Sequence, residues 1–190
     1  MIAPEIAYRN VRPGSLLLAE PYSQDAWFGR SVVWIASHED SGTFGFTINK
    51  QLNLSLAEMI NDFPPGPFMP YFGGPVRTQT LNYIHRLGGK LIPGAHHVAN
   101  GVYWGGDYDI VRQLIETGEL HPDQIKFFLG SAGWDEGQLY GEFMRGDWGV
   151  QLPGSELDLI GHTHNLWYDA IEQNDTYRHW ALVPEDPEDN

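Results

Sequence analysis

Short apolar runs separated by turn residues recur along the chain and predict β-strands. Gly, Pro, Ser, Asn and Asp bound these runs, which is typical of buried strands. The second and third runs are joined by a polar turn at residues 38–42, so they predict a β-hairpin. The predicted strands are residues 15–19, 31–37, 43–49, 71–72, 81–87, 98–104, 124–129 and 148–152.

Apolar residues spaced three and four apart predict helices between several of these strands. Ser55 and Glu58 form a capping-box pattern at the start of the first helix. Asp107 or Asp109 can cap the second helix. Gly146 follows the third helix at the position where a left-handed glycine commonly ends a helix. The predicted helices are residues 54–62, 109–119, 135–145 and 165–173.

Composition and element order together predict one domain of the mixed α/β class. The chain has 190 residues, of which 42% are hydrophobic and 13% aromatic, and this is enough for a substantial core. The 22 glycines and 13 prolines favour a β-rich fold with irregular connections. We expect a single domain over residues 1–190 that comprises an irregular arm at 1–13, a core at 14–152, a C-terminal helical extension at 153–184, with residues from 175 onward as a tail, and an acidic end at 185–190.

The charge balance argues against direct binding of nucleic acid. The formal net charge is −14, and removing the four acids of residues 185–190 leaves −10, so the body of the protein is acidic as well. Proteins bind duplex DNA chiefly through Lys and Arg, which neutralise phosphates. A basic partner protein, a cation and simple solubility are the three explanations for the acidity.

The cysteine content and the targeting patterns of the sequence indicate in which cellular compartment the protein is expected. The chain has no cysteine, which excludes disulfides, thiolate metal sites and cysteine nucleophiles. Neither a signal-peptide pattern nor an apolar run of about 18 residues is present. We therefore expect a cytoplasmic protein that does not enter the membrane.

The residue patterns of metal and nucleophile sites are incomplete. His162 and His164 form an H-x-H pair, but no third ligand follows at the usual short spacing. Ser131 lies in a Gly-Ser-Ala-Gly turn after a strand, although Leu129 stands where a nucleophile elbow needs glycine. No phosphate-loop or dinucleotide fingerprint is present. We expect no metal site, no cofactor and no catalytic residue.

Asn49 and Lys50 form one candidate site together with the glycine corner Gly73-Gly74-Pro75. Lys50 is one of only three lysines in this acidic chain, and it follows a predicted strand. The glycine corner offers unhindered backbone N–H groups, which can form an anion nest. The alternative is that Asn49 closes a turn and that Lys50 is solvated.

Trp134 and Gln138 are further candidates because, with Glu142, they recur every four residues and line one face of the predicted helix at 135–145. The alternative is that Trp134 packs over the Gly130–Gly133 turn while Gln138 and Glu142 stay in water. The sequence leaves both interpretations open.

Three groups of motifs resemble the AlgH/YqgE family of bacterial proteins. They occur in the expected order from about Gly14 to Leu152, and the set is specific although each motif alone is weak. The residues that carry the resemblance are Ser15-Leu16-Leu17-Leu18-Ala19, Phe28-Gly29-Arg30-Ser31-Val32-Val33, Gly45-Phe46-Thr47-Ile48-Asn49-Lys50, Tyr71-Phe72-Gly73-Gly74-Pro75-Val76 with His85, and Phe128-Leu129-Gly130-Ser131-Ala132-Gly133-Trp134 with Gly137-Gln138-Leu139, Glu142 and Trp148.

This resemblance implies a barrel-like mixed sheet surrounded by helices, and a cytosolic bacterial protein of a family named for transcriptional regulation. Two departures matter. Ser131 stands where relatives commonly carry Tyr or Cys, so a thiol-based role does not transfer. The region after Leu152 is longer than in many members, so its role is open.

Two functions are consistent with these patterns. The first is a non-enzymatic regulatory or interaction protein with a protein partner, since no acid–base or nucleophile constellation is evident. The second is a protein that binds a small anion or metabolite, or an unrecognised enzyme, through Asn49, Lys50 and the Gly73-Gly74 corner. The sequence does not identify the partner or the oligomeric state.

Overall fold

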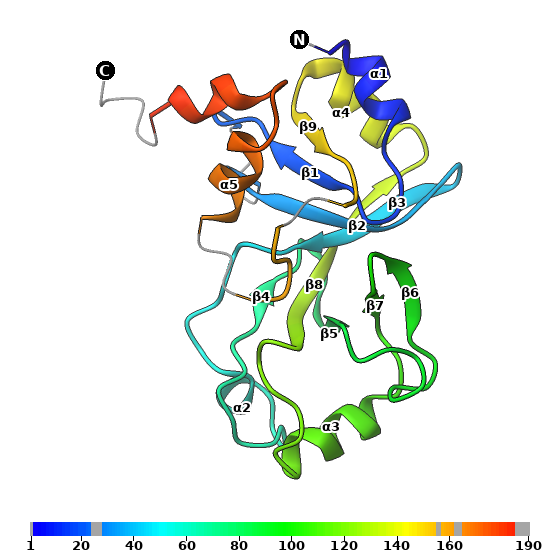
Figure 1. Cartoon of the computed structure of the whole chain (residues 1–190), viewed down its shortest axis with the longest axis vertical. Coiled ribbons are helices and arrows are strands. Elements are labelled where there is room, and N and C mark those ends of the chain that lie inside the picture. Colours follow the sequence, from blue (N-terminus) through cyan, green and yellow to red (C-terminus); the bar gives the residue numbers. More distant parts are fainter. Residues whose placement is uncertain (1, 24–27, 155–156, 162–164, 185–190) are drawn as a thin grey trace.

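The computed structural model describes residues 2–23, 28–154, 157–161 and 165–184. Nine strands in this part of the chain form one sheet, and helices pack against it (Figure 1). The strands are β1 (Leu16–Ala19), β2 (Val32–Glu39), β3 (Gly42–Thr47), β4 (Tyr71–Phe72), β5 (Val76–His85), β6 (His96–Ala99), β7 (Val102–Trp104), β8 (Ile125–Asp135) and β9 (Trp148–Gln151). The helices are α1 (Pro4–Arg9), α2 (Leu56–Met59), α3 (Tyr108–Glu116), α4 (Gln138–Arg145), α5 (Leu166–Glu172) and the 3₁₀ helix η1 (Arg178–Leu182).

The mixed α/β class is confirmed, and the sheet that we expected to be barrel-like is open. Its strand order is β6-β7-β5-β8-β3-β2-β1-β9, and β4 pairs with β8 in parallel. Every other pairing is antiparallel. Among the described residues no pairing joins β6 to β9, so these two strands are the ends of the sheet.

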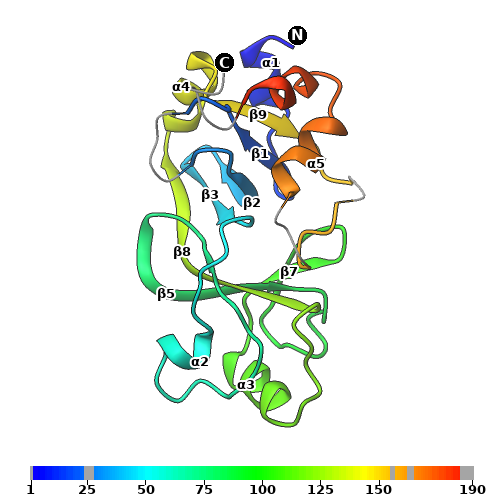
Figure 2. The same ribbon diagram turned by 90° about the vertical axis from the view of Figure 1, so that its left-hand side faces the viewer.

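The long strand β8 connects two lobes. Its first half pairs with β5, and its second half pairs with β3. The upper lobe holds β1, β2, β3, β9, α1, α4 and α5, and the lower lobe holds β4 to β7, α2 and α3 (Figures 1 and 2). Gly130 lies between the two halves with φ 74, a backbone conformation that glycine adopts without strain.

The central strands are buried on both faces, which explains their continuous apolar runs. Leu16 and Leu18 pack in one cluster with Trp167 of α5. Leu17 packs on the opposite face in a second cluster that includes Phe143 of α4. Because α5 contributes fully buried residues to the first cluster, the segment that we expected to be a C-terminal extension helps to form the core.

Several predicted elements differ from the structure. The predicted arm contains α1, and the predicted tail contains η1. The predicted strand at 98–104 is a hairpin of β6 and β7, which turns at Asn100-Gly101 with φ of 50 and 73. Positive φ at both central residues is the signature of the Asn-Gly hairpin turn. No helix among the described residues is long and apolar enough to cross a membrane.

The predicted turn at Gly130–Gly133 is wrong, because these residues lie within β8. Ser131 pairs with β5, and Ala132 and Gly133 pair with β3, so the strand continues through this stretch although Gly130 itself has a positive φ. As a result α4 begins at Gln138 instead of residue 135. The predicted capping box of Ser55 and Glu58 is confirmed at the start of α2, as is the cap that Asp107 provides for α3.

Candidate functional site

A cavity of about 480 Å³ lies where the end of β3, the start of β2 and α5 meet in the upper lobe. We call it the Arg30–Lys50 pocket. Its described lining residues are Pro21, Ser23, Gly29, Arg30, Asn49, Lys50, Trp167 and Tyr168. Asn49 and Lys50, which the sequence singled out, therefore do line a cavity.

Asn49 fixes the backbone on which the pocket is built. Its side-chain Oδ1 accepts a hydrogen bond from the Val32 amide at 2.8 Å, and its Nδ2 donates to the Arg30 carbonyl at 3.0 Å. Both groups of the amide are thus used to hold the chain just before β2 against the end of β3. Asn49 positions the pocket wall, which agrees with the interpretation that it closes a turn.

Lys50 is half-buried in the pocket wall. Its Nζ donates to the Gly29 carbonyl at 2.6 Å. Burial lowers the pKa of Lys50, and the positive charge of Arg30 lowers this pKa further. Lys50 is therefore half-buried and hydrogen-bonded to the backbone, not fully surrounded by water as the alternative interpretation has it.

Arg30 is the second cation of the pocket. In the sequence it contributes to the family resemblance, but no pattern predicted it as a site residue. Its φ of 49 is a left-handed conformation that non-glycine residues seldom adopt. The guanidinium donates to the Tyr168 hydroxyl and to the carbonyls of Val183 and Pro184, the latter two at 2.9 and 2.6 Å. It also lies 5.1 Å from the centre of the Trp167 ring, which is within cation–π range.

No carboxylate of the described residues lies within ion-pair distance of Arg30 or Lys50. A guanidinium has five N–H donors and an ammonium has three. The hydrogen bonds to described groups use three donors of Arg30 and one of Lys50, so each cation keeps two N–H groups for a further acceptor. Two partly desolvated like charges are costly together, and a bound anion offsets that cost.

The Gly73-Gly74-Pro75 corner does not line the Arg30–Lys50 pocket and instead packs against β3 and β8. The Gly73 N–H donates to the Leu129 carbonyl, and the Gly73 carbonyl accepts from the Thr47 amide, both at 2.8 Å. A side chain at Gly73 or Gly74 would collide with the backbone of β8. The expected anion nest is therefore not available at Gly73, whereas Pro75 is exposed on the surface.

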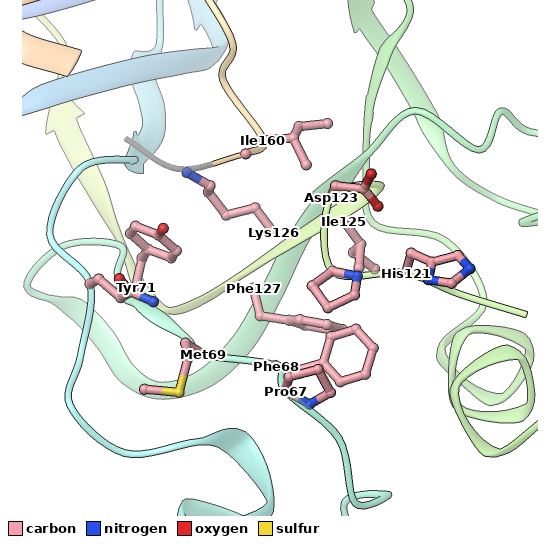
Figure 3. A pocket seen from close by; sticks show the side chains of 13 residues that line it. Pro67, Phe68, Met69, Tyr71, His121, Asp123, Ile125, Lys126, Phe127 and Ile160 are labelled. Atoms are coloured by element: carbon pink, nitrogen blue, oxygen red, sulfur yellow. The ribbon is translucent and has the colours of Figure 1, made fainter. Parts of the chain in front are cut away.

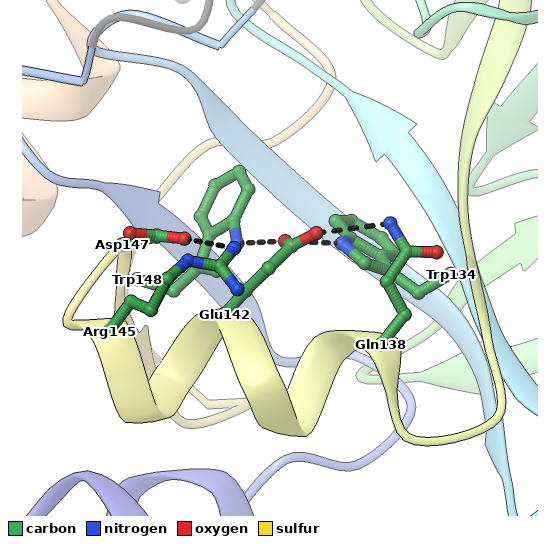
Figure 4. Close-up of polar contacts among 6 residues, drawn as sticks. All are labelled: Trp134, Gln138, Glu142, Arg145, Asp147 and Trp148. Atoms are coloured by element: carbon green, nitrogen blue, oxygen red, sulfur yellow. Dashed lines mark hydrogen bonds and ion pairs between the residues drawn. The ribbon is translucent and has the colours of Figure 1, made fainter.

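Trp134 and Gln138 belong to a separate cluster around the Glu142 carboxylate (Figure 4). Glu142 Oε2 accepts from the indole N–H groups of Trp134 and Trp148, each at 2.7 Å, and Oε1 accepts from Gln138 Nε2 at 3.0 Å. Neither Trp134 nor Gln138 lines the Arg30–Lys50 pocket. This carboxylate attaches α4 to β8 and β9.

The structure describes only some of the remaining sequence candidates for a metal or nucleophile site. Within the described ranges there is no group of three His, Cys, Asp or Glu residues that could hold a metal ion. His162 and His164 lie outside the described residues. Ser131 lies in β8, opposite Val76 of β5.

Comparisons with known proteins identify close relatives. A family model described as AlgH-like matches residues 16–177, which extends past Leu152, where the motif resemblance ended, and includes α5. A UPF0301 protein of Parabacteroides distasonis is 37% identical over 187 residues, covering 96% of this chain and 94% of the relative. A UPF0301 protein of Bacteroides thetaiotaomicron is also 37% identical over 187 residues, with the same coverage.

Two solved structures share the fold. A crystal structure of a Corynebacterium diphtheriae protein has a TM-score of 0.74 at 23% identity, covering 96% of this chain and 98% of that one. The solution structure of the AlgH protein from Pseudomonas aeruginosa has a TM-score of 0.68 at 23% identity, covering 91% and 95%.

Proposed function

The chain belongs to the AlgH-like family, and we propose that it is a non-enzymatic regulatory protein that binds a small anion between Arg30 and Lys50. The observation that carries this proposal is a pair of half-buried cations. No carboxylate of the described residues lies within ion-pair distance of either cation. In a chain with a net charge of −14, two adjacent cations without an ion-pairing carboxylate among the described residues favour an anionic ligand.

The chemistry of the pocket lining supports binding over catalysis. The described lining residues include two cations, an amide, a serine and a tyrosine, but neither a carboxylate nor a histidine. The usual pairing of a nucleophile with a positioned general base is therefore not formed by these residues. The Trp167 and Tyr168 side chains give the anion an aromatic wall.

Arg30 also connects the ligand to the end of the chain. Both N–H groups of Nη2 hold backbone carbonyls of the C-terminal segment, those of Val183 and Pro184. An anion that draws the guanidinium toward Lys50 competes with these hydrogen bonds. We therefore assign the regulatory output to a change in how residues 183–184 are held, and a protein partner that reads this change stays a prediction, as does the cytoplasmic location.

Calorimetric titration at low ionic strength with phosphate, pyrophosphate and citrate tests the proposal. Lys50→Gln removes one cation of the pocket, and we expect at least tenfold weaker binding, equivalent to about 1.4 kcal/mol. Lys90→Gln is the matched control because Lys90 is exposed and lies outside the pocket. Absence of binding by all three anions, or equal weakening by the two substitutions, would contradict the proposal.

A further inference from the structure

Lys126 is buried at the junction of the two lobes, whereas most lysines in proteins are exposed at the surface. It lies in the first half of β8, and only 2% of the residue is exposed. Its Nζ donates to the Ile48 carbonyl at 3.1 Å and lies 4.0 Å from the centre of the Tyr71 ring. The proposed function uses none of these groups.

A cavity of about 610 Å³ adjoins Lys126, and we call it the Lys126 cavity (Figure 3). Its walls come from Gln51, from β4 and the segment before it, from the start of β8 and the segment before it, and from residues 160–161. Phe68, Phe127 and Ile125 make much of the wall apolar, whereas His121 and Asp123 are exposed polar residues of the same lining. A cavity of this size with an apolar wall and a few polar groups suits a small organic molecule.

Burial prepares the amine of Lys126 for reaction. Desolvation lowers the pKa of Lys126 to about 7, and the charge of Asp158 opposes this shift. A large fraction of the amine is therefore neutral at neutral pH, and the neutral amine is the nucleophilic form. An ordinary exposed lysine, with a pKa near 10.4, has a neutral amine in only about one molecule in a few thousand at pH 7.

We propose that the Lys126 cavity binds a small carbonyl compound with an apolar body and that Lys126 forms a reversible imine with it. Nζ attacks the carbonyl carbon to give a carbinolamine, which loses one water molecule as the C=N bond forms. Addition of water reverses the step, so no oxidant or reductant takes part. Apolar walls hold the body of the ligand, and His121 and Asp123 contact its polar end.

Reductive trapping with benzaldehyde tests this reaction. Sodium cyanoborohydride supplies hydride to any imine and converts it into a stable secondary amine, which peptide mapping by mass spectrometry locates. The chain has three lysines, so Lys90, which is exposed, is the internal reference. The N-terminal amine, whose ordinary pKa is about 7.7–8.0, shows that the reagents are active.

At pH 7 we expect Lys126 in the folded protein to be labelled at least tenfold faster than Lys90. The advantage disappears in urea. It shrinks as the pH rises from 7 to 9, because the neutral fraction of an ordinary exposed lysine rises about a hundredfold over this range, whereas an amine with a pKa of about 7 is already about half neutral at pH 7. Asp158, His121 and Asp123 are the described titratable groups near this site, and the charge of Asp158 opposes the lowering of the Lys126 pKa.

Two substitutions separate reaction in the cavity from general reactivity. Lys126→Arg keeps a cation but removes the nucleophilic amine, and labelling of this peptide should be lost. Met69→Trp places a large ring in the cavity wall, and it should lower labelling of Lys126 at least fivefold while Lys90 is unchanged. Labelling of wild-type Lys126 no faster than Lys90, or unchanged labelling in a folded Met69→Trp variant, overturns the proposal.

Discussion

At the scale of single residues, Lys126 should control how stability depends on pH. Its pKa is about 7 in the folded protein and near 10.4 in an unfolded chain. Between these values the unfolded state binds more protons, so the free energy of unfolding rises with pH. Lys50, whose pKa is also lowered, contributes with the same sign.

Urea denaturation of wild type and Lys126→Met at pH 7, 8 and 9 measures this effect. We expect the variant to lose a slope of up to about 1.4 kcal/mol per pH unit. His38 and His85 have lowered pKa values, so they finish titrating below pH 7. The pKa of Tyr83 is raised to about 12, so this residue titrates above pH 9. Parallel stability curves for the two proteins would show that Lys126 is not desolvated.

Arg30 and Lys126 show what the sequence could not reveal at this scale. Lys50 could be found because lysine is scarce in the chain and because it follows a predicted strand. The role of Arg30 depends on groups 138 to 154 residues away in the sequence, which no local pattern reports. In the sequence, Lys126 is a single charged residue within an apolar predicted strand. Only its contacts with Tyr71 and Ile48 in the structure show that it is buried.

At the scale of elements, the attachment of α4 depends on the Glu142 carboxylate. Glu142→Ala leaves the indole N–H groups of two buried tryptophans, Trp134 and Trp148, without their acceptor. Each unsatisfied buried donor costs about 1–3 kcal/mol, so we expect a total loss of about 2–6 kcal/mol by urea denaturation followed by circular dichroism.

Two further variants make the Glu142 result specific. Glu142→Gln keeps one acceptor oxygen and should lie between wild type and Glu142→Ala. Glu136→Ala removes an exposed acid just before α4 and should change stability by less than about 0.5 kcal/mol. If Glu142→Ala and Glu136→Ala behave alike, the carboxylate does not hold the helix.

The glycines of β8 and of the corner before β5 differ in how much room they have. Gly74 has φ 142, and a side chain there would collide with the Ser131 backbone. Gly133 would meet only the Val76 side chain at an ordinary 3.5 Å. We expect Gly74→Ala to lower the free energy of unfolding by about 1–3 kcal/mol and Gly133→Ala to change it by less than about 0.5 kcal/mol.

Equal urea midpoints for the two alanine variants would contradict the packing of this corner against β8. Glycine runs look alike in a sequence, and only the approach of another backbone decides which glycine is required.

Elements with a strong local signal were predicted, and those that depend on distant partners were not. The strands β1, β2 and β3 follow from their apolar runs, and α3 follows from its spacing and its Asp107 cap. The extension of β8 through Gly130–Gly133 depends on β3 and β5 on either side, and η1 carries no apolar period long enough to mark it.

At the scale of the whole molecule, the net charge of −14 predicts weak interaction with nucleic acid. We expect no micromolar binding to duplex DNA in an anisotropy titration at low salt, because few cations are available to neutralise phosphates. Binding that weakens steeply with added salt would sink this prediction. The cations Arg30 and Lys50 lie in a pocket that suits a small anion better than an extended backbone.

The two cavities give the molecule two separate chemistries. The Arg30–Lys50 pocket lies in the upper lobe and holds charged donors, whereas the Lys126 cavity lies at the junction of the lobes and holds one desolvated amine. Their described lining residues do not overlap, so a substitution can be placed in the lining of one without changing a lining residue of the other.

The most direct test of the central claim is a crystal structure of the protein soaked in tungstate, a heavy oxyanion with a strong anomalous signal. We expect an anomalous peak in the Arg30–Lys50 pocket, with oxygens within hydrogen-bond distance of Arg30 Nη1 or Nε and of Lys50 Nζ. The peak should be absent from crystals of Lys50→Gln and present in crystals of Lys90→Gln. An empty pocket in the wild type, with tungstate bound elsewhere in the crystal, would contradict the assignment of this pocket as the anion site.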